Sequence, residues 1–302
     1  MLRSRYRDIL PPATTRTGLL LGRAREAAAS AVRFAVRRRT NHLIRSPLGP
    51  LIHPEARMIV IFSPKSACTS VVIWFLHHLG HAERARQYSE WPHHYRAQVY
   101  YQSSLFRDAC NLDLTNFRVV RVVRDPFDRA ASSFRHAQRS GVADDAFAKL
   151  LGLSDAAHKG VSFCDFLDLL DRLDLTNCDE HLRLQHHPVE GRLQLTHLIN
   201  ISIEDLFERL NMVEADLGLP ITDFTALDWL TDLDRRRRRF NGAIDVADAY
   251  TMPLTRRQAQ RGPWPNYHAL LTQAARERIS RLYAADISAY GASAAAPPSK
   301  TT

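Results

Sequence analysis

The short polar segment from Ser63 to Ser70 carries the residues best suited to chemistry. It reads Ser-Pro-Lys-Ser-Ala-Cys-Thr-Ser, so several hydroxyl groups stand beside Lys65 in a chain that otherwise uses arginine for most of its basic residues. An apolar strand candidate, 58–62, precedes the segment, and a helix candidate, 71–79, follows it. A loop placed between a strand and a helix directs backbone N–H groups and the positive end of the helix dipole at one point. The segment therefore predicts a site for a phosphate or sulfate group.

The segment differs from the glycine-rich loop of nucleotide kinases. That loop follows the pattern GxxxxGK[ST], whereas this segment has no glycine and its lysine precedes the helix by several residues. An ordinary polar turn would account for the serines and threonine but not for a rare lysine. The spacing disfavours an ATP or GTP kinase.

A second strand candidate, 117–123, ends at Arg124 and leads through Asp125-Pro126 into a helix over 127–139. Ligands of open α/β sheets bind at the carboxyl ends of strands, and a guanidinium fork matches a phosphate group. Ser132 lies nearly two helical turns beyond Pro126 and offers a hydroxyl to the same group. Arg124 either binds a phosphate or pairs with Asp125 or Asp128.

Both segments resemble motifs of the carbohydrate sulfotransferases. The first is similar to their Pro-Lys-x-x-Cys/Ser-Thr loop, which binds the 5′-phosphosulfate of 3′-phosphoadenosine 5′-phosphosulfate (PAPS). The second is similar to their 3′-phosphate motif, an Arg-Asp-Pro-Phe-x-Arg sequence with a serine eight residues after its first arginine. The resemblance runs over roughly 58–291. It implies that PAPS is bound by Pro64, Lys65, Ser66, Ala67, Cys68, Thr69, Ser70, Arg124 and Ser132.

The resemblance implies in-line transfer of a sulfuryl group to a hydroxyl of a carbohydrate or glycolipid acceptor. Such a transfer moves charge onto the bridging oxygen of the leaving nucleotide, where Lys65 neutralises it, so we expect no metal. Cys68 near a helix N-terminus could form a reactive thiolate. The family carries cysteine or serine there without covalent catalysis, which favours a packing role.

Histidine is the usual base for removing the acceptor's proton near neutral pH. His93 and His94 lie between the two motifs, where some heparan-type members place catalytic histidines. His181 stands in a segment similar to the family's Asp-x-His-x-x-x-Gln sequence, which lies near the acceptor side. We predict His94 and His181 as equal candidates, although either could be structural. Glu180, His181, His186 and His187 could also be read as metal ligands, but nothing fixes their spacing.

The predicted elements that position these residues alternate between strands and helices. A third strand candidate, 196–202, precedes a helix over 204–217, and one amphipathic helix is expected over 267–287. This order predicts an α/β protein with a P-loop-like, doubly wound central parallel sheet flanked by helices, the sulfotransferase fold. We expect a basic arm and amphipathic helix over 1–50, the sulfotransferase domain over 51–293 and a disordered tail over 294–302.

The net charge of +9 arises within residues 1–45, because the rest of the chain is balanced. The amphipathic basic helix over 18–39 either contacts an anionic membrane or packs on the body; nucleic acid is not an expected partner. The four cysteines form no CxxC pair, which favours a reducing compartment. No apolar run is long enough to span a membrane and no clean secretion signal is present, so we expect a cytoplasmic protein, with membrane association as the alternative given by the basic helix. The arginine bias indicates a GC-rich bacterial genome.

The sequence thus favours a PAPS-dependent sulfotransferase. Two alternatives remain: a nucleotide kinase-like P-loop enzyme, and a non-catalytic module that binds nucleotides or anionic membranes.

Overall fold

The computed structural model describes residues 49–114, 116–186, 190, 197–239, 243–244 and 246–294. Within these residues a four-stranded sheet has the order β1-β2-β3-β4. Its strands are β1 (Leu51–His53), β2 (Met58–Phe62), β3 (Arg118–Val123) and β4 (Leu198–Ser202). The α/β class is confirmed, and the three expected strands are found with bounds within two residues of those predicted.

The sheet is mixed, which corrects the expected parallel sheet. Strands β2, β3 and β4 are parallel, but β1 pairs antiparallel to β2. The turn that joins β1 to β2 spans only Pro54–Arg57 and is closed by a hydrogen bond from Arg57 N to Pro54 O of 3.2 Å. A turn of this length joins antiparallel neighbours, because a parallel pair needs a crossover of a dozen or more residues.

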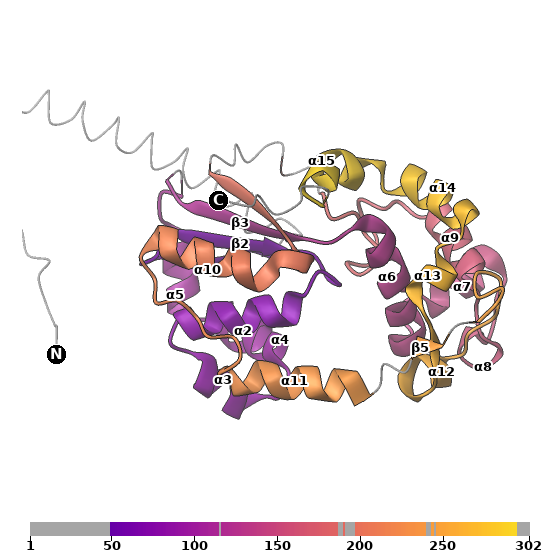
Figure 1. Cartoon of the computed structure of the whole chain (residues 1–302), viewed down its shortest axis with the longest axis horizontal. Coiled ribbons are helices and arrows are strands. Elements are labelled where there is room, and N and C mark those ends of the chain that lie inside the picture. The colour runs from indigo at the N-terminus through magenta and orange to yellow at the C-terminus, as the bar shows by residue number, and fades with distance from the viewer. Residues whose placement is uncertain are drawn as a thin grey trace, which may run out of the picture.

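Strands β2, β3 and β4 lie across the sheet in the same order as in the sequence. A doubly wound sheet would place a later strand on the other side of the first one, so that order is not observed in the described part of the chain. Helices α2 (Cys68–His78) and α10 (Leu206–Leu217) lie side by side on one face of the sheet (Figure 1). The short 3-10 turn η3 (Ile203–Asp205) leads from β4 into α10. Helix α2 begins three residues earlier than predicted, at Cys68, because Thr69 and Ser70 are buried within its first turn.

A buried polar cluster joins α2 to α10. The carboxylate of Glu214 accepts hydrogen bonds from Trp74 Nε1 at 2.6 Å and from the Thr222 hydroxyl and backbone N–H at 2.6 and 2.8 Å. His78 Nε2 lies 2.7 Å from the same carboxylate. Burial alone would raise the pKa of Glu214, but these hydrogen bonds hold it below its usual value. The ionised carboxylate therefore fixes the C-terminal half of α2, whose N-terminus adjoins the polar segment.

Further helices extend the layer around α2 (Figure 1). They are α3 (Ala82–Tyr88), α4 (Pro92–Tyr95), the π-helical η1 (Arg96–Tyr100), α5 (Ser104–Ala109) and α11 (Asp228–Arg239).

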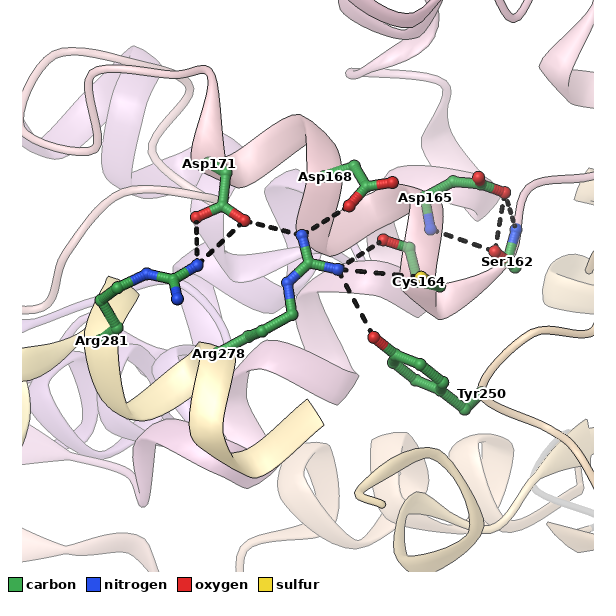
Figure 2. A network of polar contacts seen from close by, with 8 residues as sticks. All are labelled: Ser162, Cys164, Asp165, Asp168, Asp171, Tyr250, Arg278 and Arg281. Carbon is green, nitrogen blue, oxygen red and sulfur yellow. Dashed lines mark hydrogen bonds and ion pairs between the residues drawn. The ribbon is translucent and has the colours of Figure 1, made fainter. Parts of the chain in front are cut away.

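A second group of helices has its own apolar core, beside the sheet (Figure 1). It contains α6 (Pro126–Ser140), α7 (Asp144–Leu151), α8 (Ala156–Lys159), α9 (Phe163–Asp171), α12 (Arg256–Arg261), α13 (Tyr267–Leu270) and α14 (Gln273–Leu282), with the short strands β5 (Ala243–Ile244) and β6 (Trp264–Pro265). Figure 2 shows how polar contacts join α14 to α9: Arg278 lies 2.6 Å from Asp168 and 2.7 Å from Asp171, and Arg281 lies 3.0 Å from Asp171. Helix α6 follows directly on β3, so this second group is tied to the sheet at Arg124.

The C-terminal region contains three helices, α13, α14 and α15 (Ala284–Ala294), in place of the single helix expected over 267–287. Thr272 caps the N-terminus of helix α14, where its side chain accepts a hydrogen bond from Ala275 N, and Tyr283 caps the C-terminus. The capping threonine breaks the periodic pattern that predicted one continuous helix. Helix α15 returns to the sheet, where the ring of Tyr290 lies 5.3 Å from the guanidinium carbon of Arg121 on β3.

Several predictions fall on residues outside the described part of the chain. They are the basic arm and its helix over 18–39, the tail from 295 onward, and His187. Within the described ranges, no helix combines the length and the apolar character needed to cross a membrane.

Candidate active site

The segment between β2 and α2 forms a tight loop with an unusual backbone. Lys65 and Ala67 both adopt positive φ, 72° and 52°, which non-glycine residues rarely do. Each such residue costs of order 1–3 kcal/mol, so the surrounding structure must hold it in place. Ser66 N donates to Ser63 O at 3.2 Å and closes the turn. Ala67 is the N-cap residue of helix α2 and makes no side-chain capping hydrogen bond, which leaves the first N–H groups of the helix available to an anion.

Two arginines from the second motif hold the carbonyl groups of this loop. Arg124 Nη1 donates to Lys65 O at 3.1 Å, and Arg129 Nε donates to Pro64 O at 3.2 Å. The Arg124 guanidinium carbon lies 5.7 Å from the centre of the Tyr267 ring, and the Arg124 Nε atom is buried without a hydrogen-bond partner among the described residues. The two predicted motifs are therefore in direct contact, and Arg124 keeps donor capacity for a further anionic group.

Gln185 connects the same two motifs from a third segment of the chain. Its Oε1 atom accepts hydrogen bonds from Ser66 Oγ at 2.9 Å and from Arg124 N at 3.0 Å. Its Nε2 atom donates to Arg124 O at 2.8 Å. The side chain thus joins the loop to the end of β3.

The remaining predicted nucleotide-binding residues lie around this junction. Thr69 and Ser70 are buried in the first turn of α2, and Ser132 is buried on α6. Cys68 is half-buried and packs with Ala67 against the core of the sheet.

A pair of stacked histidines lies near Lys65. The rings of His136 and His181 are 4.0 Å apart at an angle of 25°, and His181 Nδ1 lies 2.9 Å from Asp179 Oδ1. Burial, the charge of Lys65 and the neighbouring His181 lower the pKa of His136 to about 3. The hydrogen bond from His181 holds the pKa of Asp179 below its usual value. The pair therefore consists of a neutral His136 and a His181 oriented by an ionised carboxylate.

His94, the other predicted base, lies on α4 and is exposed. Its Nδ1 atom is 3.0 Å from Ser89 Oγ, and no hydrogen bond joins it to the loop among the described residues. Its neighbour His93 instead packs edge-on against Phe62, the last residue of β2, with ring centres 6.3 Å apart. The guanidinium carbon of Arg96 lies 5.4 Å from the same Phe62 ring. These two side chains therefore contact the last residue before the loop.

Three site residues were not assigned a role from the sequence: His136, Gln185 and Tyr267. His136 lies four residues beyond Ser132 on α6, so helical periodicity places both on one face and was an available signal. Gln185 belongs to the Asp-x-His-x-x-x-Gln segment, which was associated with the acceptor, yet its side chain contacts the loop and Arg124. Tyr267 carried no sequence signal. Among the described residues, no group of three or more His, Cys, Asp or Glu side chains is arranged to hold a metal ion.

Comparison with known proteins gives a single family assignment. The model of the sulfotransferase family matches residues 50–291, which includes both motifs, Gln185 and α15 up to Gly291. No curated protein and no solved structure matches the chain. Because the match spans most of the 302 residues, the chain belongs to the sulfotransferase family and is an enzyme of the transferase class.

Proposed function

We propose that the chain transfers a sulfuryl group from PAPS to a hydroxyl of a carbohydrate or glycolipid acceptor. The single observation that carries the proposal is the contact between Arg124 Nη1 and Lys65 O, reinforced by Gln185. A ligand that offers one anionic group to the loop and another to Arg124 would bind both at once. PAPS has this form, because it carries a 5′-phosphosulfate and a 3′-phosphate on one adenosine.

The residues around the junction fit this donor. Lys65, the hydroxyls of Ser66, Thr69 and Ser70 and the first N–H groups of α2 would hold the phosphosulfate. Arg124, whose Nε is buried without a partner, and Ser132 would hold the 3′-phosphate. The ring of Tyr267 packs against the guanidinium group of Arg124. These positive charges offset the negative charge that the donor brings.

The proposed transfer breaks the bond from sulfur to the bridging phosphate oxygen and forms a bond from sulfur to the acceptor oxygen. Lys65 stabilises the charge that develops on the bridging oxygen, and 3′,5′-adenosine bisphosphate is the leaving product. The acceptor hydroxyl gives its proton to a base, for which the geometry favours His181. Asp179 accepts a hydrogen bond from His181 Nδ1–H and leaves Nε2 free to receive the proton. His94 stays a prediction as the alternative base.

The proposal is tested by incubating the full chain with ³⁵S-labelled PAPS and separate pools of glycans and glycolipids. Label should enter one pool, and the Lys65→Met variant should lose turnover while still binding 3′,5′-adenosine bisphosphate. Thermal unfolding gives an independent check, because the bisphosphate should raise the melting temperature without magnesium. Stabilisation by ATP with magnesium, and none by the bisphosphate, would contradict the proposal.

Location and membrane contact are proposals of the same kind. We propose a cytoplasmic enzyme whose residues 18–39 either contact anionic lipid or pack on the body. Vesicles containing phosphatidylserine should sediment the full chain, and a chain lacking residues 1–45 should stay in the supernatant.

A further inference from the structure

The side-chain amide of Gln185 makes three hydrogen bonds within the candidate site. Gln185 is 1% exposed, and these bonds join its amide to Ser66 Oγ, Arg124 N and Arg124 O, as described above. Its partners lie 119 and 61 positions away in sequence. The amide is needed in its present form, because it accepts on one side and donates on the other, which neither a carboxylate nor an apolar side chain can do.

Gln185 is itself held firmly by groups behind it. The carboxylate of Asp286 on α15 accepts hydrogen bonds from Gln185 N at 3.0 Å and His186 N at 2.7 Å. Arg121 Nη2 donates to Gln185 O, and Arg121 Nη1 lies 2.9 Å from Glu190. Asp286 and Arg121 are fully buried. A continuous set of buried polar contacts therefore runs from α15 through Gln185 to the loop.

We infer that Gln185 is a positioning residue that fixes the spacing between the phosphosulfate loop and Arg124. This inference rests on the proposed function and extends it. Two binding groups held at a fixed spacing act on a two-ended ligand as one site, because the second contact forms without a further loss of freedom. Without the amide, each group still binds its own phosphate, but the gain from binding both at once falls.

The test compares three probes by isothermal titration calorimetry: 3′,5′-adenosine bisphosphate, 5′-AMP and 3′-AMP. The variant Gln185→Met keeps the volume of the side chain and removes the amide. Its affinity for the bisphosphate should fall about tenfold or more, the size expected from losing one or more buried hydrogen bonds. Its affinities for the two monophosphates should stay within about threefold of the wild type.

Gln138 supplies a matched control, because it is also 1% exposed but lies on α6, and its amide has no hydrogen-bond partner among the residues that the structure describes. Gln138→Met should leave the ratios among the three probes unchanged. If Gln185→Met does not fold, Gln185→Asn keeps the amide but shortens the side chain by one methylene group, so the amide no longer reaches both motifs and the variant should show the same selective loss at smaller size.

The outcomes separate the inference from the proposed function. An equal loss for all three probes, or no loss, overturns the positioning role while leaving the donor site intact. A wild-type chain that binds the bisphosphate no better than the monophosphates overturns the proposed function, and the inference with it.

Discussion

Replacing Arg124 by methionine tests the assignment of the 3′-phosphate directly. Its guanidinium group donates to Lys65 O at 3.1 Å and packs on Tyr267, and within the described part of the chain its Nε atom is buried without a partner. A hydrogen bond to a charged group contributes about 1.5–3 kcal/mol, which corresponds to roughly a tenfold to 150-fold change in the dissociation constant. Arg124→Met should therefore weaken the bisphosphate and 3′-AMP by this factor and change 5′-AMP only slightly.

Calorimetry at fixed ionic strength measures these affinities, and a thermal melt verifies that the variant is folded. Arg124→Lys gives the matched comparison: it keeps the charge but loses the planar fork, so it should recover only part of the affinity. Equal weakening of 5′-AMP and 3′-AMP would refute the reasoning, because Arg124 would then act only by holding the carbonyl of Lys65.

Three further predictions concern the helix that follows the loop and the histidine pair. Glu214→Leu should lower the free energy of unfolding by about 3–5 kcal/mol, because the buried donors around α2 lose their hydrogen-bond acceptor. Chemical denaturation measures this loss, and a change below about 1 kcal/mol would contradict a stabilising role for the polar cluster. NMR titration should find His136 neutral down to about pH 4, and Lys65→Met should raise the pKa of His136. The pKa of His136 in the folded state lies below the unfolded value of 6.5. Its contribution to stability is therefore present above about pH 6.5 and is lost as the pH falls toward 3. His181→Ala should lower kcat by about 10²–10⁴-fold and Asp179→Asn by a smaller factor, and neither variant should change the affinity for the bisphosphate. A parallel loss of that affinity would show that His181 and Asp179 only support the loop.

Strands β2 and β3 were predictable because they are rich in Val and Ile and stay buried on both faces, although β3 also carries the buried Arg121; β4 is buried only at Ile201 and Ser202. Residues 58–62 are all buried, as are 119–123. Strand β1 was missed, since three residues after a proline carry no periodic signal. The single C-terminal helix was predicted wrongly because periodicity alone does not register a capping residue such as Thr272.

The loop and Arg124 were predictable because residue type and position on the chain define them. The contacts that join them were not, because Gln185 comes from an irregular segment and reaches both motifs only through the tertiary fold. The same holds for Asp286, a buried aspartate whose partners are backbone N–H groups 100 and 101 positions away. Long-range polar contacts of this kind leave no periodic pattern in a single sequence.

The absence of glycine from the loop has a physical consequence. A glycine-rich loop adopts positive φ without strain but loses much freedom when it orders around a phosphate. Here Lys65 and Ala67 adopt positive φ although they are not glycines. Three successive loop residues are hydrogen-bonded to residues outside the loop: Pro64 O to Arg129, Lys65 O to Arg124, and Ser66 Oγ to Gln185. These three contacts hold the loop in this conformation, so the loop would need little further ordering to bind an anion. The contacts from Arg124 and Arg129 of the second motif therefore help to balance the strain at Lys65 and Ala67.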